Sequence, residues 1–100
     1  MNRKTGHVYT PKATREYEES VAWSARASRV SFGDRSVWVK ITLVFNRAPR
    51  GDIDNFEKAI LDGLEKGQLF DNDRQVLQKS TRVIIGYVGE EHAVVQVGLL

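Results

Sequence analysis

The spacing of apolar side chains predicts two amphipathic helices. In the first, apolar residues recur at every fourth position and the pattern continues to about Ser28, with members Ala13, Tyr17, Val21 and Ala25. In the second, the stripe again has helical spacing, and its members are Ile53, Phe56, Ile60 and Leu64. Gly67 is typical of a helix C-terminus, so we expect the second helix to end there.

A period of two replaces the helical period elsewhere. Apolar residues alternate with their neighbours from Val37 to Asn46 and are rich in β-branched types, which predicts a strand. Two more strands are expected over residues 75–87 and 92–100, joined by a hairpin loop at Gly89 to Glu91. Residues 1–9 carry no clear pattern and are expected to be irregular.

These elements predict an α+β fold over residues 1–100 as a single domain. Their expected order is helix, strand, helix, strand, strand, with both helices packed on one mixed sheet. The first strand, the second helix and the next strand are expected to form a right-handed crossover between parallel strands.

Composition excludes several classes of protein. Apolar residues make up 41% and charged residues 28%, as in ordinary globular domains, which argues against disorder. Cysteine is absent, so disulfides, thiolate metal sites and thiol nucleophiles are excluded. No apolar run is long enough for a transmembrane helix or a signal core, so we expect a soluble, intracellular domain with no membrane partner.

Charge divides the chain into a basic and an acidic half. Residues 1–50 hold ten Lys or Arg against four acids, whereas residues 51–100 hold five against nine. Seven carboxylates fall within residues 51–73. Cations that bind phosphate beside carboxylates that hold a metal would suit an enzyme acting on a polyanion. Unevenly distributed surface charge explains the same counts and stays open as an alternative.

The acidic cluster has the composition of a site for a hard divalent cation. Asp52 and Asp54 flank the start of the second helix, Lys58 follows one turn later, and Asp73 ends the next connection, so both ends of this unit carry acids that could converge. Carboxylates without nearby His or Cys favour Mg²⁺ or Mn²⁺ over zinc. Helix capping and a surface pair of Lys58 with Asp54 or Asp62 remain the alternative.

Basic residues border this cluster. Arg47 and Arg50 immediately precede the aspartates, and Lys12 and Arg15 belong to a basic N-terminal region. Contact with phosphate is the functional interpretation, and solvated surface charge is the alternative.

Trp23 is expected to lie in the core or in a dimer interface rather than to stack on a base.

At the acidic cluster the sequence resembles a known family. Asp52 to Asp62 reads D-I-D-N-F-E-K-A-I-L-D and Asp71 to Val76 reads D-N-D-R-Q-V. These segments are similar to the signature of the RusA family of Holliday junction resolvases, D-x-D-N-x-x-K-x-x-x-D followed by a D-Q-V-like segment. Asn72 and Arg74 depart from the pattern of some members. The resemblance covers roughly residues 7–97.

The resemblance implies a Mg²⁺-dependent endonuclease, with Mn²⁺ as a substitute, that resolves four-way DNA junctions by paired symmetric nicks in recombination and repair. It also implies a homodimer and a cytoplasmic protein of bacterial or phage origin. Carried over position by position, Asp52, Asp54 and Asp73 match the metal-binding aspartates and Lys58 the catalytic lysine. Asp62 matches a further aspartate whose role, structural or supporting, stays open.

One departure from the family leaves rival functions open. Members usually begin with a strand before the segment that starts here at about Gly6, so we expect this strand to be missing and an edge of the sheet to be exposed. A junction-binding module without cleavage is therefore an alternative. A metal-dependent enzyme acting on a small phosphorylated substrate is another, although the sequence has no Gly-rich phosphate loop.

Overall fold

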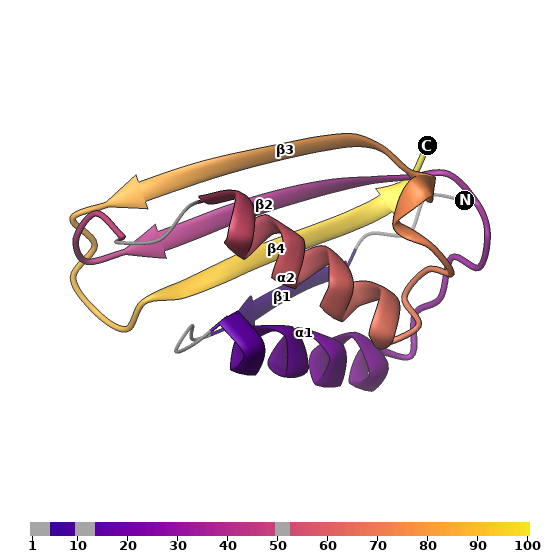
Figure 1. Cartoon of the computed structure of the whole chain (residues 1–100), viewed down its shortest axis with the longest axis horizontal. Helices are drawn as coiled ribbons and strands as arrows, with labels where there is room; N and C mark the ends of the chain where they lie inside the picture. The colour runs from indigo at the N-terminus through magenta and orange to yellow at the C-terminus, as the bar shows by residue number, and fades with distance from the viewer. Residues whose placement is uncertain (1–4, 10–13, 50–52) are drawn as a thin grey trace.

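The computed structural model of the protein describes residues 5–9, 14–49 and 53–100, with one sheet and two helices in this part of the chain (Figure 1). No helix in these ranges is long and apolar enough to cross a membrane. The elements in chain order are β1 (Thr5–Tyr9), α1 (Thr14–Ser28), β2 (Val37–Phe45), α2 (Ile53–Lys66), the short 3-10 helix η1 (Asp73–Gln75), β3 (Val76–Ile85) and β4 (His92–Leu99).

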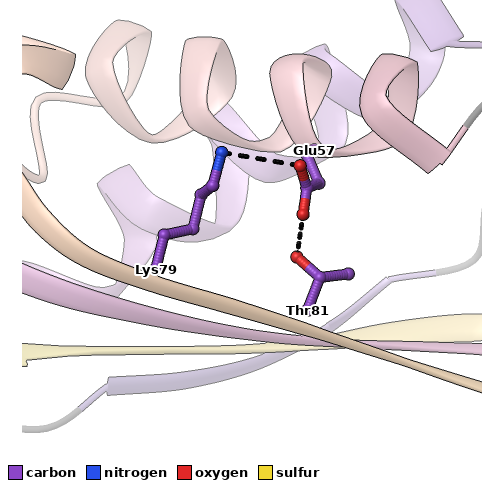
Figure 2. A network of polar contacts seen from close by, with 3 residues as sticks. All are labelled: Glu57, Lys79 and Thr81. Atoms are coloured by element: carbon purple, nitrogen blue, oxygen red, sulfur yellow. Dashed lines mark hydrogen bonds and ion pairs between the residues drawn. The ribbon is translucent and has the colours of Figure 1, made fainter.

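The strands form one mixed sheet in the order β1-β4-β2-β3. β2 pairs in parallel with β3, whereas β4 runs antiparallel to both β1 and β2. Both helices lie on the same side of the sheet, as the edge-on view in Figure 2 shows. The predicted α+β class, with two helices on a mixed sheet, is therefore confirmed, as is the parallel pair of strands that α2 connects.

The expected irregular N-terminus is wrong, because β1 precedes α1. Its pairing with β4 runs from Thr5 opposite Val97 to Tyr9 opposite Ala93. A strand of five residues is too short to show a period of its own, and its backbone is ordered by the partner strand. The expected order, helix first, is thus incorrect at its start, and β4 is paired on both sides instead of leaving an exposed edge.

The expected hairpin between the last two strands is also wrong. β3 and β4 lie on opposite sides of β2, so the segment between them passes around the end of β2. Asn46 holds this segment, since its Nδ2 donates to the carbonyls of Tyr87 and Gly89, each at 2.8 Å. Its backbone N–H donates to the Glu91 carboxylate at 2.7 Å. One side chain after β2 therefore organises the connection.

The core lies between the sheet and the helices. Odd-numbered residues of β2 are buried against the helices, which explains the alternation in its sequence. The largest fully buried side chains of this layer are Val21, Val37, Val39, Ile41, Leu43, Ile60, Leu64, Leu69, Phe70, Val95 and Val97. The Phe45 ring also meets the Phe56 ring edge to face, with centroids 5.5 Å apart. The first turns of α2 are thereby fixed to the end of β2.

Two glycines let the helices approach each other closely. A Cβ at Gly63 would lie 2.6 Å from the Glu18 carbonyl oxygen, and one at Gly67 would lie 2.5 Å from that of Ala22. At Gly67, the close approach of α1 leaves no space for a side chain. The left-handed residue that ends α2 is Gln68, with φ 62°, and the N–H of Leu69 closes the helix end on the Leu64 carbonyl at 3.0 Å.

A polar contact fixes α2 to β3 (Figure 2). The Glu57 carboxylate accepts a hydrogen bond from the Thr81 hydroxyl and lies 3.5 Å from Lys79 Nζ. The Glu57 side chain is 16% exposed, whereas that of Lys79 is 41% exposed. The hydrogen bond is the better shielded of the two contacts and is expected to contribute more to stability.

The close helix contact predicts a destabilised Gly63→Ala variant. Alanine improves helix propensity, yet its Cβ would collide with the α1 backbone, so we expect the free energy of unfolding to fall by about 1–3 kcal/mol. Urea denaturation followed by circular dichroism measures this change. Lys66→Ala, at an exposed position of the same helix, is the control, and a gain in stability for Gly63→Ala would contradict the packing argument.

The contact between α2 and β3 predicts unequal costs for its members. Glu57→Ala should lower the free energy of unfolding by about 1–2 kcal/mol, because the Thr81 hydroxyl loses its acceptor. Lys79→Ala should cost at most about 0.5 kcal/mol, since exposed ion pairs contribute little. Equal losses in urea denaturation would show that the ion pair matters as much as the hydrogen bond.

Candidate active site

The N-terminal turns of α2 carry the first group of predicted site residues. Asp54 lies in the first turn and Lys58 one turn later, and both side chains are exposed. A carboxylate in the first turn is stabilised by the positive end of the helix dipole. Asp52 and Arg50, predicted as a metal ligand and a DNA contact, lie outside the described residues.

Lys58 does not form the surface ion pair with Asp54 or Asp62 that would explain this lysine without a role in catalysis. All three side chains are described in the structure. The carboxylates of Asp54 and of the half-buried Asp62 both lie beyond ion-pair distance of the Lys58 amine. Lys58 is exposed, and no ion pair of its ammonium occurs among the described residues.

Asp73 is held firmly at the opposite end of α2. Its backbone N–H donates to the Glu65 carboxylate at 3.0 Å, so η1 begins beside the last turns of the helix. Asn72 and Gln75 form a reciprocal capping box around η1. The Gln75 amide also donates to the carbonyls of Gly33 and Arg35, both at 2.7 Å. The backbone of Asp73 therefore has a fixed position, and its side chain is exposed.

Asp54 and Asp73 of one chain do not converge. Asp54 and Glu65 are eleven residues apart in α2, which corresponds to about 16 Å along the helix axis. Asp73 follows Glu65 along the chain and precedes β3, so it lies near the end of α2, which is opposite the start of α2 along the sheet (Figure 1). Consistently, no cluster of three or more acidic or His side chains suited to a metal occurs among the described residues.

The predicted phosphate contacts are described only in part. Arg47 is exposed and follows β2, at the same end of the sheet as Asp54. Lys12 lies outside the described residues, and Arg15 is described only as part of the α1 backbone. Trp23 is 71% exposed on α1, so it does not lie in the core, and its place in a dimer interface stays a prediction.

Three polar residues that organise the site were missed from the sequence. Glu57 anchors α2, Asn46 holds the turn after β3, and Gln75 fixes η1. The spacing of Asn72 and Gln75 is a capping-box signal and could have revealed the last of these. Asn46 gave no comparable signal, because its partners are backbone carbonyls more than 40 residues away.

Comparison with solved structures shows a likeness of fold alone. A crystal structure of a HypE–HypF complex matches with a TM-score of 0.52 and 13% identity, over 99% of this chain and 33% of that one. E. coli HypE matches with a TM-score of 0.47 and 11% identity, over 99% of this chain and 31% of that one. The chain thus spans about a third of the length of these proteins.

Comparison of sequences identifies the family. Among curated proteins none matches this chain. The family model described as endodeoxyribonuclease RusA matches residues 1–98 of the 100. This match covers the segments that carry the acidic cluster, β1 and all of the sheet except the last residue of β4. The chain therefore belongs to the RusA family of Holliday junction resolvase-type endodeoxyribonucleases.

Proposed function

We propose that this protein is a Mg²⁺-dependent endonuclease that resolves four-way DNA junctions by paired symmetric nicks in recombination and repair. Membership of the RusA family supports the endonuclease class. The observation that carries the proposal for this chain is the pair of exposed side chains at the start of α2, a carboxylate and an ammonium one turn apart without an ion pair between them.

The donor set fits a hard cation. Asp54 offers an exposed carboxylate at a helix N-terminus, and Asp52, two residues earlier, would offer a second. Oxygen donors of this kind suit Mg²⁺, with Mn²⁺ as a substitute. Such an ion, when bound, activates water and stabilises the attacking and leaving oxygens of a phosphodiester.

The remaining roles fall to groups of this chain. As water adds to phosphorus and the bond from phosphorus to the 3′ oxygen breaks, negative charge builds up on the phosphate oxygens. The Lys58 ammonium would stabilise that charge. The products are a 5′-phosphate and a 3′-hydroxyl, which a ligase can seal. Arg47, with Arg50, Lys12 and Arg15, would hold the flanking phosphates, and Asp62 would act as a supporting residue.

The separation of Asp54 from Asp73 supports a homodimer. A site that contains both carboxylates requires Asp54 from one chain and Asp73 from another, because α2 separates them within a chain. A two-fold dimer would contain two such sites, and a four-way junction presents two equivalent strands. The two-fold symmetry of the dimer would then account both for the paired nicks and for the site shared between two chains.

The proposal predicts metal-dependent nicking that requires Asp54. On a synthetic four-way junction with Mg²⁺ we expect paired nicks, which disappear with a chelator and fall by at least about 100-fold for Asp54→Asn, because a metal ligand is lost. A linear duplex of the same sequence is the control substrate. Equal junction affinity of both proteins without nicking by either would favour a binding module, and activity indifferent to DNA would favour a small-substrate enzyme.

The shared site predicts that two inactive variants restore each other. In a mixed dimer of Asp54→Asn and Asp73→Asn, one site carries both substitutions and the other carries none. We therefore expect the co-refolded mixture to recover single nicks, up to about a quarter of the wild-type site number if dimers form at random. Each variant alone is the control. A mixture as inactive as its components would contradict the shared site.

A further inference from the structure

The face of the sheet that points away from the helices is covered by no described element, and we call it the open face. Both helices lie on the other face (Figure 2). Odd-numbered residues of β2 point toward the helices, so Trp38, Lys40 and Thr42 point to the open face. The register of the strands adds their neighbours to this face, which are Gln78, Ser80 and Arg82 of β3 and Val94, Gln96 and Gly98 of β4.

The charge of the open face is positive. The chain has 13 acidic residues, yet none of the four described strands contains an Asp or Glu. Lys40 and Arg82 are exposed and supply the charge of this face. In the register of β2 with β3, Lys40 lies opposite Ser80, so Arg82 follows about 7 Å further along the strands. Two cations in a row without a nearby strand carboxylate complement a polyanion.

An aromatic ring lies next to these cations. A Cβ at Gly98 would be 2.5 Å from Cε2 of the Trp38 indole, so the glycine lets this half-buried ring pack against the sheet. Lys40 Nζ lies 5.8 Å from the ring centroid, in a cation–π contact. A nucleobase that stacks on the indole would displace this exposed ammonium, which would then pair with a phosphate of the same strand.

A hollow of about 360 Å³ lies beside the ring. Its volume is at the lower end of the range for small-ligand sites. The exposed amide and hydroxyl in its wall offer hydrogen-bond donors and acceptors to the edge of a base. The lining residues are Trp38, Val39, Lys40, Gln78, Lys79 and Ser80.

We propose that the open face binds single-stranded DNA along β2 and β3, with a base stacked on Trp38 and phosphates on Lys40 and Arg82. Stacking requires an unpaired base, so a regular duplex is not the preferred occupant. An apolar protein surface fits less well, because the neighbours of the ring in the hollow are mostly polar or charged. α2, with Asp54 and Lys58, lies on the other face, so this inference goes beyond the proposed cleavage and does not require it.

The first test uses the two tryptophans of the chain. In Trp23→Phe, Trp38 is the sole tryptophan, and an oligothymidine of about 12 nucleotides should quench its emission as a base stacks on it. In Trp38→Phe, Trp23 remains on α1 and its emission should stay unchanged. A chelator is present throughout, so that the strand is not cleaved. Quenching that is equal in both variants, confined to Trp38→Phe or absent from both would overturn the inference.

The second test measures affinity by the fluorescence anisotropy of labelled oligothymidine. Trp38→Leu should weaken binding at least about fivefold, because a stacked base is lost, whereas Trp23→Leu should bind as the wild type does. Arg82→Gln should weaken binding and reduce the slope of log affinity against log salt by about 0.7, because a phosphate contact is lost. Lys66→Gln, which removes an exposed cation of α2, is its control.

Urea denaturation checks that these variants are folded. Arg82 is exposed, so its variant tests the surface even if Trp38→Leu does not fold. Wild-type affinity in folded Arg82→Gln, or equal losses in Arg82→Gln and Lys66→Gln, would overturn the inference.

Two competitors define the ligand. Duplex DNA of the same length and polyglutamate should displace the oligothymidine at least about fivefold less well, since neither offers an unpaired base. Equal competition by either one would show a general surface for polyanions and overturn the inference.

The outcomes separate this inference from the proposed function. Quenching of Trp38 by oligothymidine, without nicking of four-way junctions by the wild type, would support the single-strand surface and refute the nuclease. Metal-dependent nicking without that quenching would support the nuclease and refute the surface.

Discussion

The parallel pairing of β2 with β3 determines where the acidic residues of this protein can lie. Parallel strands that are neighbours in a sheet need a connection that returns from one end of the sheet to the other, and here α2 is that connection. Asp54 follows the end of β2 and Asp73 precedes the start of β3, so the two carboxylates are placed at opposite ends. Asp54 and Asp73 are therefore far apart in the structure, although only the helix and a short connection separate them in the sequence.

Two local contacts make that placement rigid. Gly63 and Gly67 bring α2 against the backbone of α1, and Glu57 fixes the same helix to β3. Because the helix is held on both flanks, Asp54 and Lys58 are presented from a fixed surface. At the other end, Gln75 fixes η1 to the connection between α1 and β2. The shared site proposed above would need such rigidity, since each half would have to be positioned before a second copy binds.

Helices and strands with a clear apolar periodicity could be predicted from the sequence. Which strands lie side by side in the sheet could not. The end of α1 at Ser28 and the extent of α2 follow from apolar stripes, and β2 follows from its alternation. β1 was missed because five residues are too few to show a period. The hairpin was wrongly expected because spacing does not reveal which strand lies beside which. Composition held a clue, since β4 has no Lys, Arg, Asp or Glu and is central, whereas β3 carries Lys79 and Arg82 and is an edge.

The position of β4 has a consequence for how the chain folds during synthesis. β4 lies between β1 and β2, yet it is the last of these strands to leave the ribosome. Until β4 has left the exit tunnel, β1 has no partner among the described strands and β2 is paired on one side only. The sheet of the nascent chain therefore remains incomplete, and open to chaperones and proteases, until β4 has been synthesised and released from the tunnel.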